Sequence, residues 1–80
     1  MNKPITITNE EMDWLEDAVG VYENDTEDPA NIIVAYLLRR VIEFATPTKS
    51  GHTLHPDSQA ERNVILDTLD EWREFELEAE

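Results

Sequence analysis

Residues 28–45 decide the fold of this chain, and their sequence is DPANIIVAYLLRRVIEFA. Asp28 can cap a helix, and Pro29 suits its first position because that position needs no backbone donor. The residues that follow are mostly apolar, with two arginines and one glutamate as their only charged members. The β-branched residues among them are compatible with a strand, but the length of the segment favours a helix over about residues 29–45. A helix that is apolar on nearly every side requires neighbours that bury it.

An amphipathic helix is predicted before this apolar segment, over about residues 9–22. Thr8 and Glu11 have capping-box spacing, so the hydroxyl and the carboxylate can satisfy free backbone N–H groups at the start of the helix. Apolar residues then recur at steps of three and four, which places them on one face. These residues are Met12, Leu15, Val19 and Tyr22.

A second amphipathic helix is predicted after the apolar segment, over about residues 58–77. Ser58 and Glu61 repeat the capping-box spacing at its start. The stripe expected to face the core consists of Ile65, Leu69, Trp72 and Phe75. A separate stripe at helical spacing is wholly acidic and is expected to face solvent. Its members are Asp67, Asp70, Glu71, Glu74 and Glu78.

The remaining segments are predicted to lack helix. Residues 1–8 are expected to be extended, because isoleucine and threonine alternate over residues 5–8. Residues 46–56 form the longest predicted loop, which prolines and a glycine interrupt. A turn at Ser50 and Gly51 could form a small hairpin. In that case Thr53 and Leu54 would pair as a strand with Ile5 and Ile7.

One small domain over residues 1–80 is expected, because a chain of this length supports a single core. Hydrophobic residues make up 40% of the chain, which is enough for a core of modest stability. We predict an all-α fold: a small three-helix bundle with a short extended N-terminal segment. The apolar helix would pack between the two amphipathic ones.

The charge of the chain is strongly negative and unevenly placed. Asp and Glu total 19 and Lys and Arg total 6, which gives a net charge of −13. Residues 1–28 contain nine acids and residues 57–80 contain nine more, with only Glu43 between them. This charge density opposes compaction, so it indicates attraction to a basic partner. It also disfavours direct binding to nucleic acid or to anionic lipid.

The acidic residues of the two amphipathic helices are the candidate partner-binding residues. Carboxylates three or four residues apart on a helix lie roughly 5–6 Å apart, so they form a row that could occupy a groove lined by lysine and arginine. The alternative is a solvated face that only keeps the protein soluble. Trp14 lies between two of these acids and is either a binding anchor or a core residue. The predicted set is Glu10, Asp13, Trp14, Asp17, Asp67, Asp70, Glu71 and Glu74.

The sequence contains no catalytic signature and no metal-ligand pattern. Counting residues does not exclude a carboxylate pair for acid–base catalysis, but such a pair needs a cleft, which three short helices rarely form. No cysteine is present, so neither disulfides nor thiolates contribute. His52 and His55 form a single pair without the further ligands that zinc needs. Residues 24–28 lack the spacing of a calcium-binding loop. We therefore expect a binding protein rather than an enzyme, with no cofactor and no metal.

The sequence also bears on location. Residues 1–8 lack the apolar run of a signal peptide. The longest apolar run, residues 32–38, is far too short to cross a bilayer. Together with the lack of cysteine, these features predict a cytoplasmic protein without membrane contact.

In size, acidic helices, lack of cysteine and lack of a catalytic motif, the chain resembles the small acidic inhibitors of bacteriophages, above all anti-CRISPR proteins and other DNA mimics. That group shares no sequence motif, so the resemblance assigns no residue a role. Several members block target-DNA binding by the multi-subunit Cascade complex, because they cover lysines and arginines that would hold DNA. The resemblance implies an inhibitor of this kind, acting in the host cytoplasm on a Cas protein surface.

Two functional hypotheses follow from the sequence. The first is an acidic inhibitor that binds a Lys/Arg-rich surface and blocks DNA binding by electrostatic and steric occlusion. The alternative is a helical oligomerising scaffold, or an antitoxin that neutralises a basic partner, with residues 30–45 forming a homodimer contact. The protein is expected to be a monomer or a homodimer, and a stable dimer through residues 30–45 would favour the second hypothesis.

Overall fold

Three helices and three short strands form the part of the chain that the computed structural model describes, residues 3–25 and 27–79. The helices are close to those predicted over residues 9–22, 29–45 and 58–77. Of the segment predicted to be extended, residues 1 and 2 lie outside the described part. The elements are β1 (Ile5–Thr8), α1 (Asn9–Asn24), α2 (Pro29–Glu43), β2 (Thr46–Pro47), β3 (Gly51–Leu54) and α3 (Gln59–Ala79).

Helix α1 begins where the predicted capping box lies. The Thr8 hydroxyl accepts a hydrogen bond from the Glu11 backbone N–H at 3.1 Å, and the Glu11 carboxylate accepts one from the Thr8 N–H at 3.0 Å. The start of α2 is also as predicted, because Asp28 accepts from the Ala30 N–H at 3.0 Å and Pro29 is the first helical residue. Local capping chemistry therefore sets both starts.

The start of α3 differs from the prediction in one bond. The Ser58 hydroxyl accepts from the Glu61 N–H at 3.2 Å, as expected. The Glu61 carboxylate accepts from the Asp57 N–H at 2.6 Å, one residue before Ser58. Glu61 is only 5% exposed and also lies 3.8 Å from the Arg40 guanidinium, which joins this cap to α2.

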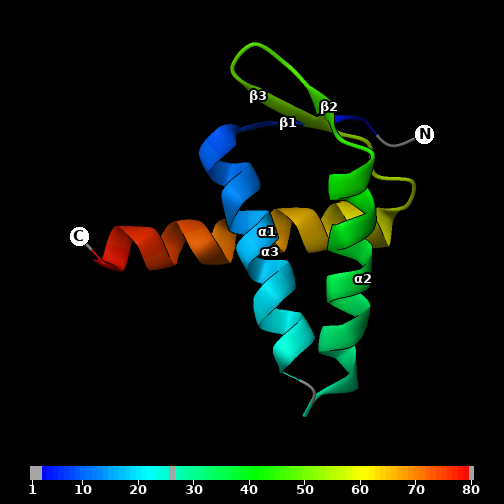
Figure 1. Ribbon diagram of the computed structural model, residues 1–80, viewed down its shortest axis with the longest axis vertical. Coiled ribbons are helices and arrows are strands. Elements are labelled where there is room, and N and C mark those ends of the chain that lie inside the picture. The colour runs from blue at the N-terminus through cyan, green and yellow to red at the C-terminus, as the bar shows by residue number, and fades with distance from the viewer. Residues whose placement is uncertain (1–2, 26, 80) are drawn as a thin grey trace.

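The all-α prediction is corrected by a small antiparallel sheet with strand order β1-β3-β2. Strand β1 pairs with β3, as the hairpin alternative predicted for these two segments, and the register places Ile5 opposite Leu54 and Ile7 opposite His52. The sheet forms because Ile7 and Leu54 are both buried in the core that the helices share. The protein is thus mostly helical, with a three-stranded sheet at one end of α1 and α2 (Figure 1).

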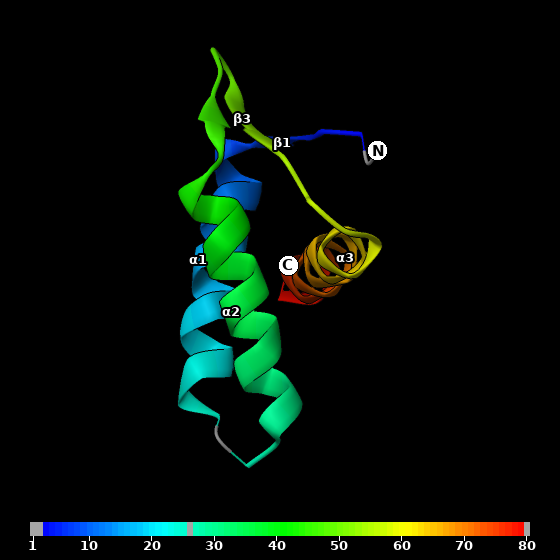
Figure 2. The same cartoon turned by 90° about the vertical axis from the view of Figure 1, so that its right-hand side faces the viewer.

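The helices form two layers. Helices α1 and α2 lie side by side and run in opposite directions, and α3 runs across one side of that pair (Figures 1 and 2). The core therefore lies between this pair and α3. Its largest fully buried side chains come one each from α1, α2, β3 and α3, and they are Leu15, Leu38, Leu54 and Ile65.

The prediction that α2 packs between the outer helices is wrong. Helix α3 covers the same side of the pair that buries Ala35, Leu38 and Val41, so the opposite side of α2 remains open to solvent. On that side Ile33 is 60% exposed and Tyr36 is 64% exposed. The fold therefore buries only part of the apolar surface of α2.

The inner stripe of α3 is also shorter than predicted. Ile65 and Leu69 are buried and Trp72 is half-buried, but Phe75 is 71% exposed. The reason is the crossing of α3, whose C-terminal part extends beyond α1 and has no helix beneath it (Figure 1). Within the described ranges, the helices are too short or too polar for any of them to span a bilayer.

Candidate functional site

The acidic face of α1 is exposed as predicted. Glu10, Asp13 and Asp17 lie on the side of the helix turned away from its buried residues. Helix α1 is held in place at its first turn, where the Glu11 carboxylate accepts from Arg73 of α3 at 3.0 Å. The three carboxylates therefore sit on a helix that is fixed at its start by both a cap and an ion pair.

The acidic face of α3 is exposed along its whole length. Asp67, Glu74 and Glu78 face solvent, together with Asp70 and Glu71. Asp70 lies 3.4 Å from the Arg73 guanidinium one turn later on the same helix. Like charges at helical spacing repel one another, so this stripe does not stabilise its own helix.

The arginines of the protein are mostly bound to acids outside the predicted site. Arg39 pairs with Glu23, and Arg40 pairs with Asp57 at 3.0 Å. Of the predicted acidic site residues, Asp70 alone has an ion-pair partner within residues 3–25 and 27–79. The other carboxylates of both faces therefore keep their charge available for an external cation.

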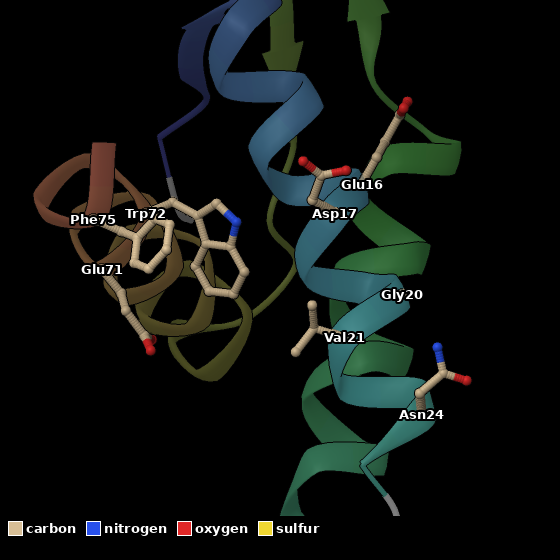
Figure 3. Close-up of a pocket in the computed structure, with 8 residues that line it drawn as sticks. All are labelled: Glu16, Asp17, Gly20, Val21, Asn24, Glu71, Trp72 and Phe75. Atoms are coloured by element: carbon tan, nitrogen blue, oxygen red, sulfur yellow. The ribbon is translucent and has the colours of Figure 1, made fainter. Parts of the chain in front are cut away.

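A groove lies where α1 and α3 diverge, with a volume of about 690 Å³ (Figure 3). Helix α1 forms one wall and the part of α3 that extends beyond it forms the other. The surface of α1 is open at Gly20, because a Cβ built there would meet no atom within 4 Å. The lining residues are Glu16, Asp17, Gly20, Val21, Asn24, Glu71, Trp72 and Phe75.

One wall of the groove is fixed by an aromatic pair. The rings of Tyr22 and Trp72 meet edge to face with centroids 6.0 Å apart. The Tyr22 hydroxyl donates to the Glu71 carboxylate at 3.3 Å. Burial raises the pKa of the Tyr22 hydroxyl above its ordinary value, and the charge of Glu71 and this hydrogen bond raise it further. Tyr22 therefore holds both Trp72 and Glu71 in position at the groove.

The structure brings some of the predicted site residues together and separates others. Asp17 of α1 and Glu71 of α3 line the same groove. Trp14 is half-buried and packs against the core, outside that groove. Trp72 packs against the core, as expected, and it also lines the groove. Of the two tryptophans, Trp72 therefore borders the groove and Trp14 does not.

Sequence reasoning missed several groove residues, including Glu16, Val21 and Phe75. Their exposure depends on where α3 crosses α1, which no local pattern specifies. A usable signal was present at Gly20, because a glycine within an amphipathic helix often marks a packing or functional site. Asp17, Val21 and Asn24 also lie at helical spacing from one another.

His52 and His55 belong to no metal-ligating cluster within residues 3–25 and 27–79. Across the described ranges, no group of three or more potential metal-ligating side chains occurs. His55 lies 3.0 Å from the Thr46 hydroxyl through its Nε2 atom. The Nδ1 atom of His52 is buried without a hydrogen-bond partner among the described residues.

Comparison of the chain with protein-family models, with curated proteins and with solved structures gives no match in any of the three.

Proposed function

We propose that this chain is a binding protein without catalytic turnover. Its acidic faces on α1 and α3 dock on a Lys/Arg-rich surface of a nucleic-acid-binding protein and exclude the nucleic acid. The observation that carries this proposal is the set of exposed carboxylates on two helices, nearly all without ion-pair partners in the described part of the chain.

The electrostatic field of the protein supports this role. The net charge is −13, and the radius of gyration is only 12.3 Å. The Debye length at 0.1 M salt is about 10 Å. The electrostatic potential therefore extends from the surface over a distance similar to the radius of gyration. Such a field accelerates encounter with a basic surface and weakens as salt is added.

The most concrete target is a Cascade surveillance complex, which the resemblance to acidic bacteriophage inhibitors suggests. Binding there would be by occlusion in the cytoplasm of the host cell, with no cofactor required. A competition assay tests this directly: purified protein should displace target DNA from purified Cascade, and more protein should be needed at higher salt. Unchanged DNA binding at saturating protein would reject Cascade as the target.

A charge-reversal pair tests the docking face rather than the net charge. The test variant replaces three exposed acids of α3 by lysine: Asp67→Lys, Glu71→Lys and Glu74→Lys. The control variant makes the same change in net charge at exposed acids outside the two faces: Asp25→Lys, Glu27→Lys and Glu43→Lys. The α3 variant should lose displacement while the control keeps most of it. Equal losses would mean that net charge alone acts, which contradicts a docking face.

A second candidate function rests on the uncovered side of α2. Ile32, Ile33 and Tyr36 are each more than half exposed on that side. We propose, as the alternative, that this side mediates homodimer formation in a scaffold or antitoxin. Light scattering of the wild-type protein and of Ile33→Asp tests it. A dimer that the substitution converts to a monomer supports this candidate, and a wild-type monomer at high concentration contradicts it.

A further inference from the structure

The groove between α1 and α3 has an apolar surface that an acidic docking face alone does not require. Phe75 is 71% exposed and Val21 is 53% exposed, and Trp72 lies between them. Figure 3 shows the ring of Phe75 beside the indole of Trp72, with the Val21 side chain directed toward that indole across the groove. Aromatic and aliphatic surface left open in a groove is typical of a site that a ligand covers.

Carboxylates flank this apolar surface on both walls. Asp17 stands on α1, and Glu71 stands on α3. Neither forms an ion pair within residues 3–25 and 27–79. Glu16 also lines the groove, but its side chain points away from α3, so it contributes negative potential rather than a contact (Figure 3).

The groove is already ordered before any ligand arrives. The edge-to-face contact with Tyr22 fixes the Trp72 ring, and the Tyr22 hydroxyl holds the Glu71 carboxylate. A preformed site avoids the cost of ordering side chains upon binding. The occupant must therefore match a fixed combination of aromatic surface and negative charge.

We propose that this groove receives an arginine side chain of the protein partner. The aliphatic stem would lie against Val21 and Phe75, and the guanidinium would stack on Trp72 near the carboxylates of Asp17 and Glu71. Arginine fits better than lysine, because its planar and weakly hydrated cation stacks on aromatic rings and pairs with carboxylates in a bidentate manner. This inference rests on the proposed function, since it names the part of the basic surface that anchors the complex.

The other ligand classes fit less well. A nucleic acid or another anion would meet uncompensated carboxylates on both walls. A purely apolar ligand would take water from Asp17 and Glu71 without replacing their hydrogen bonds. Only a cation on an apolar stem satisfies both parts of the groove.

The inference is tested on the full ¹⁵N-labelled chain by NMR titration with three blocked peptides that differ in one residue. The central residue is arginine, lysine or citrulline, the last being the neutral counterpart of arginine. The arginine peptide should shift the Trp72 indole N–H and the backbone amides of Gly20 and Glu71, with weak affinity. Lysine should bind several-fold more weakly, and citrulline about tenfold more weakly. Equal shifts from the arginine and citrulline peptides would overturn the proposal.

A groove-blocking variant separates this site from the acidic faces. Val21→Lys places a resident cation and its stem opposite the Trp72 indole, and the helix can accept it because Val21 is 53% exposed. Ile33→Lys is the matched control, because Ile33 is an exposed aliphatic helical residue outside the groove and the change in net charge is the same. Val21→Lys should reduce binding of the arginine peptide about tenfold, and Ile33→Lys should leave it unchanged. Retained binding by Val21→Lys overturns the assignment to this groove.

The two proposals fail in different ways. If Val21→Lys displaces DNA from Cascade as well as Ile33→Lys does, the groove inference fails while the acidic docking function stands. If the arginine peptide binds the groove but the protein displaces no DNA, the inhibitor function fails and the arginine site stands.

Discussion

Alanine substitution at the two glycines of the chain is predicted to change the free energy of unfolding in opposite directions. At Gly51 an added Cβ would lie 1.9 Å from the Ile7 carbonyl oxygen and 2.9 Å from the Thr8 Cα. Gly51 pairs with Thr8 in the sheet, so the close approach is between two backbones rather than with a flexible side chain. No positive backbone φ is involved, and the requirement for glycine is purely one of space.

The magnitude follows from this contact. Ordinary contact begins at 3.4 Å, so β1 and β3 would have to separate by about 1.5 Å. Such a shift exceeds the tolerance of the neighbouring ladder hydrogen bonds, each contributing about 1 kcal/mol. It also disturbs Ile7 and Leu54, which the sheet buries in the core. We expect Gly51→Ala to lower the free energy of unfolding by about 3 kcal/mol, which is a large part of the total for a small domain.

Gly20→Ala is the control, because its Cβ would meet nothing within 4 Å. It should raise the free energy of unfolding by about 1 kcal/mol, since alanine favours a helix over glycine. Thermal unfolding followed by circular dichroism measures both. For a domain of this size, 1 kcal/mol corresponds to about 4–8 °C in Tm, so Gly51→Ala should melt at least about 12 °C lower. A Gly51→Ala variant that melts with the wild type would refute the pairing of β1 with β3.

Three further substitutions test the core and the groove. Leu38→Ala should cost about 2–5 kcal/mol in urea unfolding, because Leu38 is fully buried and truncation leaves a cavity; a loss below about 1 kcal/mol would contradict the core assignment. Arg40→Met should lower the free energy of unfolding by about 1–2 kcal/mol in the same assay, because it leaves the buried Glu61 carboxylate without its cation. An unchanged urea midpoint would show that the Arg40–Glu61 ion pair contributes nothing. Burial and Glu71 raise the pKa of Tyr22, so its contribution to stability is complete below about pH 10 and is lost as the pH rises through the folded value. The Tm of Tyr22→Phe should therefore fall less than that of the wild type as the pH rises above about 10. Identical dependence of Tm on pH in the two proteins would count against the Tyr22–Glu71 contact.

Local chemistry explains why the helices were predictable. Thr8 with Glu11, and Asp28 with Pro29, define helix starts through atoms at most three residues apart. Such contacts are encoded in short stretches of sequence and need no knowledge of the rest of the chain. Helix α3 nonetheless extends to Ala79 within the described residues, two residues beyond the predicted end, because residues 76–79 contain neither glycine nor proline.

The exposure of the acidic faces was predictable for the same reason. Carboxylates that recur at helical spacing opposite an apolar stripe must face solvent when that stripe is buried. The sequence therefore determined three helices, their starts and the outward direction of the charges on α1 and α3.

Tertiary structure alone decided which side of α2 would be covered and where α3 would cross α1. Both features depend on contacts between residues far apart in the chain, such as Leu15, Leu38 and Ile65, which share one core. The sequence of a single segment does not reveal how strong these contacts are. The crossing leaves Phe75 beyond α1 and places Trp72 at the groove. Helical periodicity states which residues share a face, but only packing between elements determines whether a neighbour covers that face.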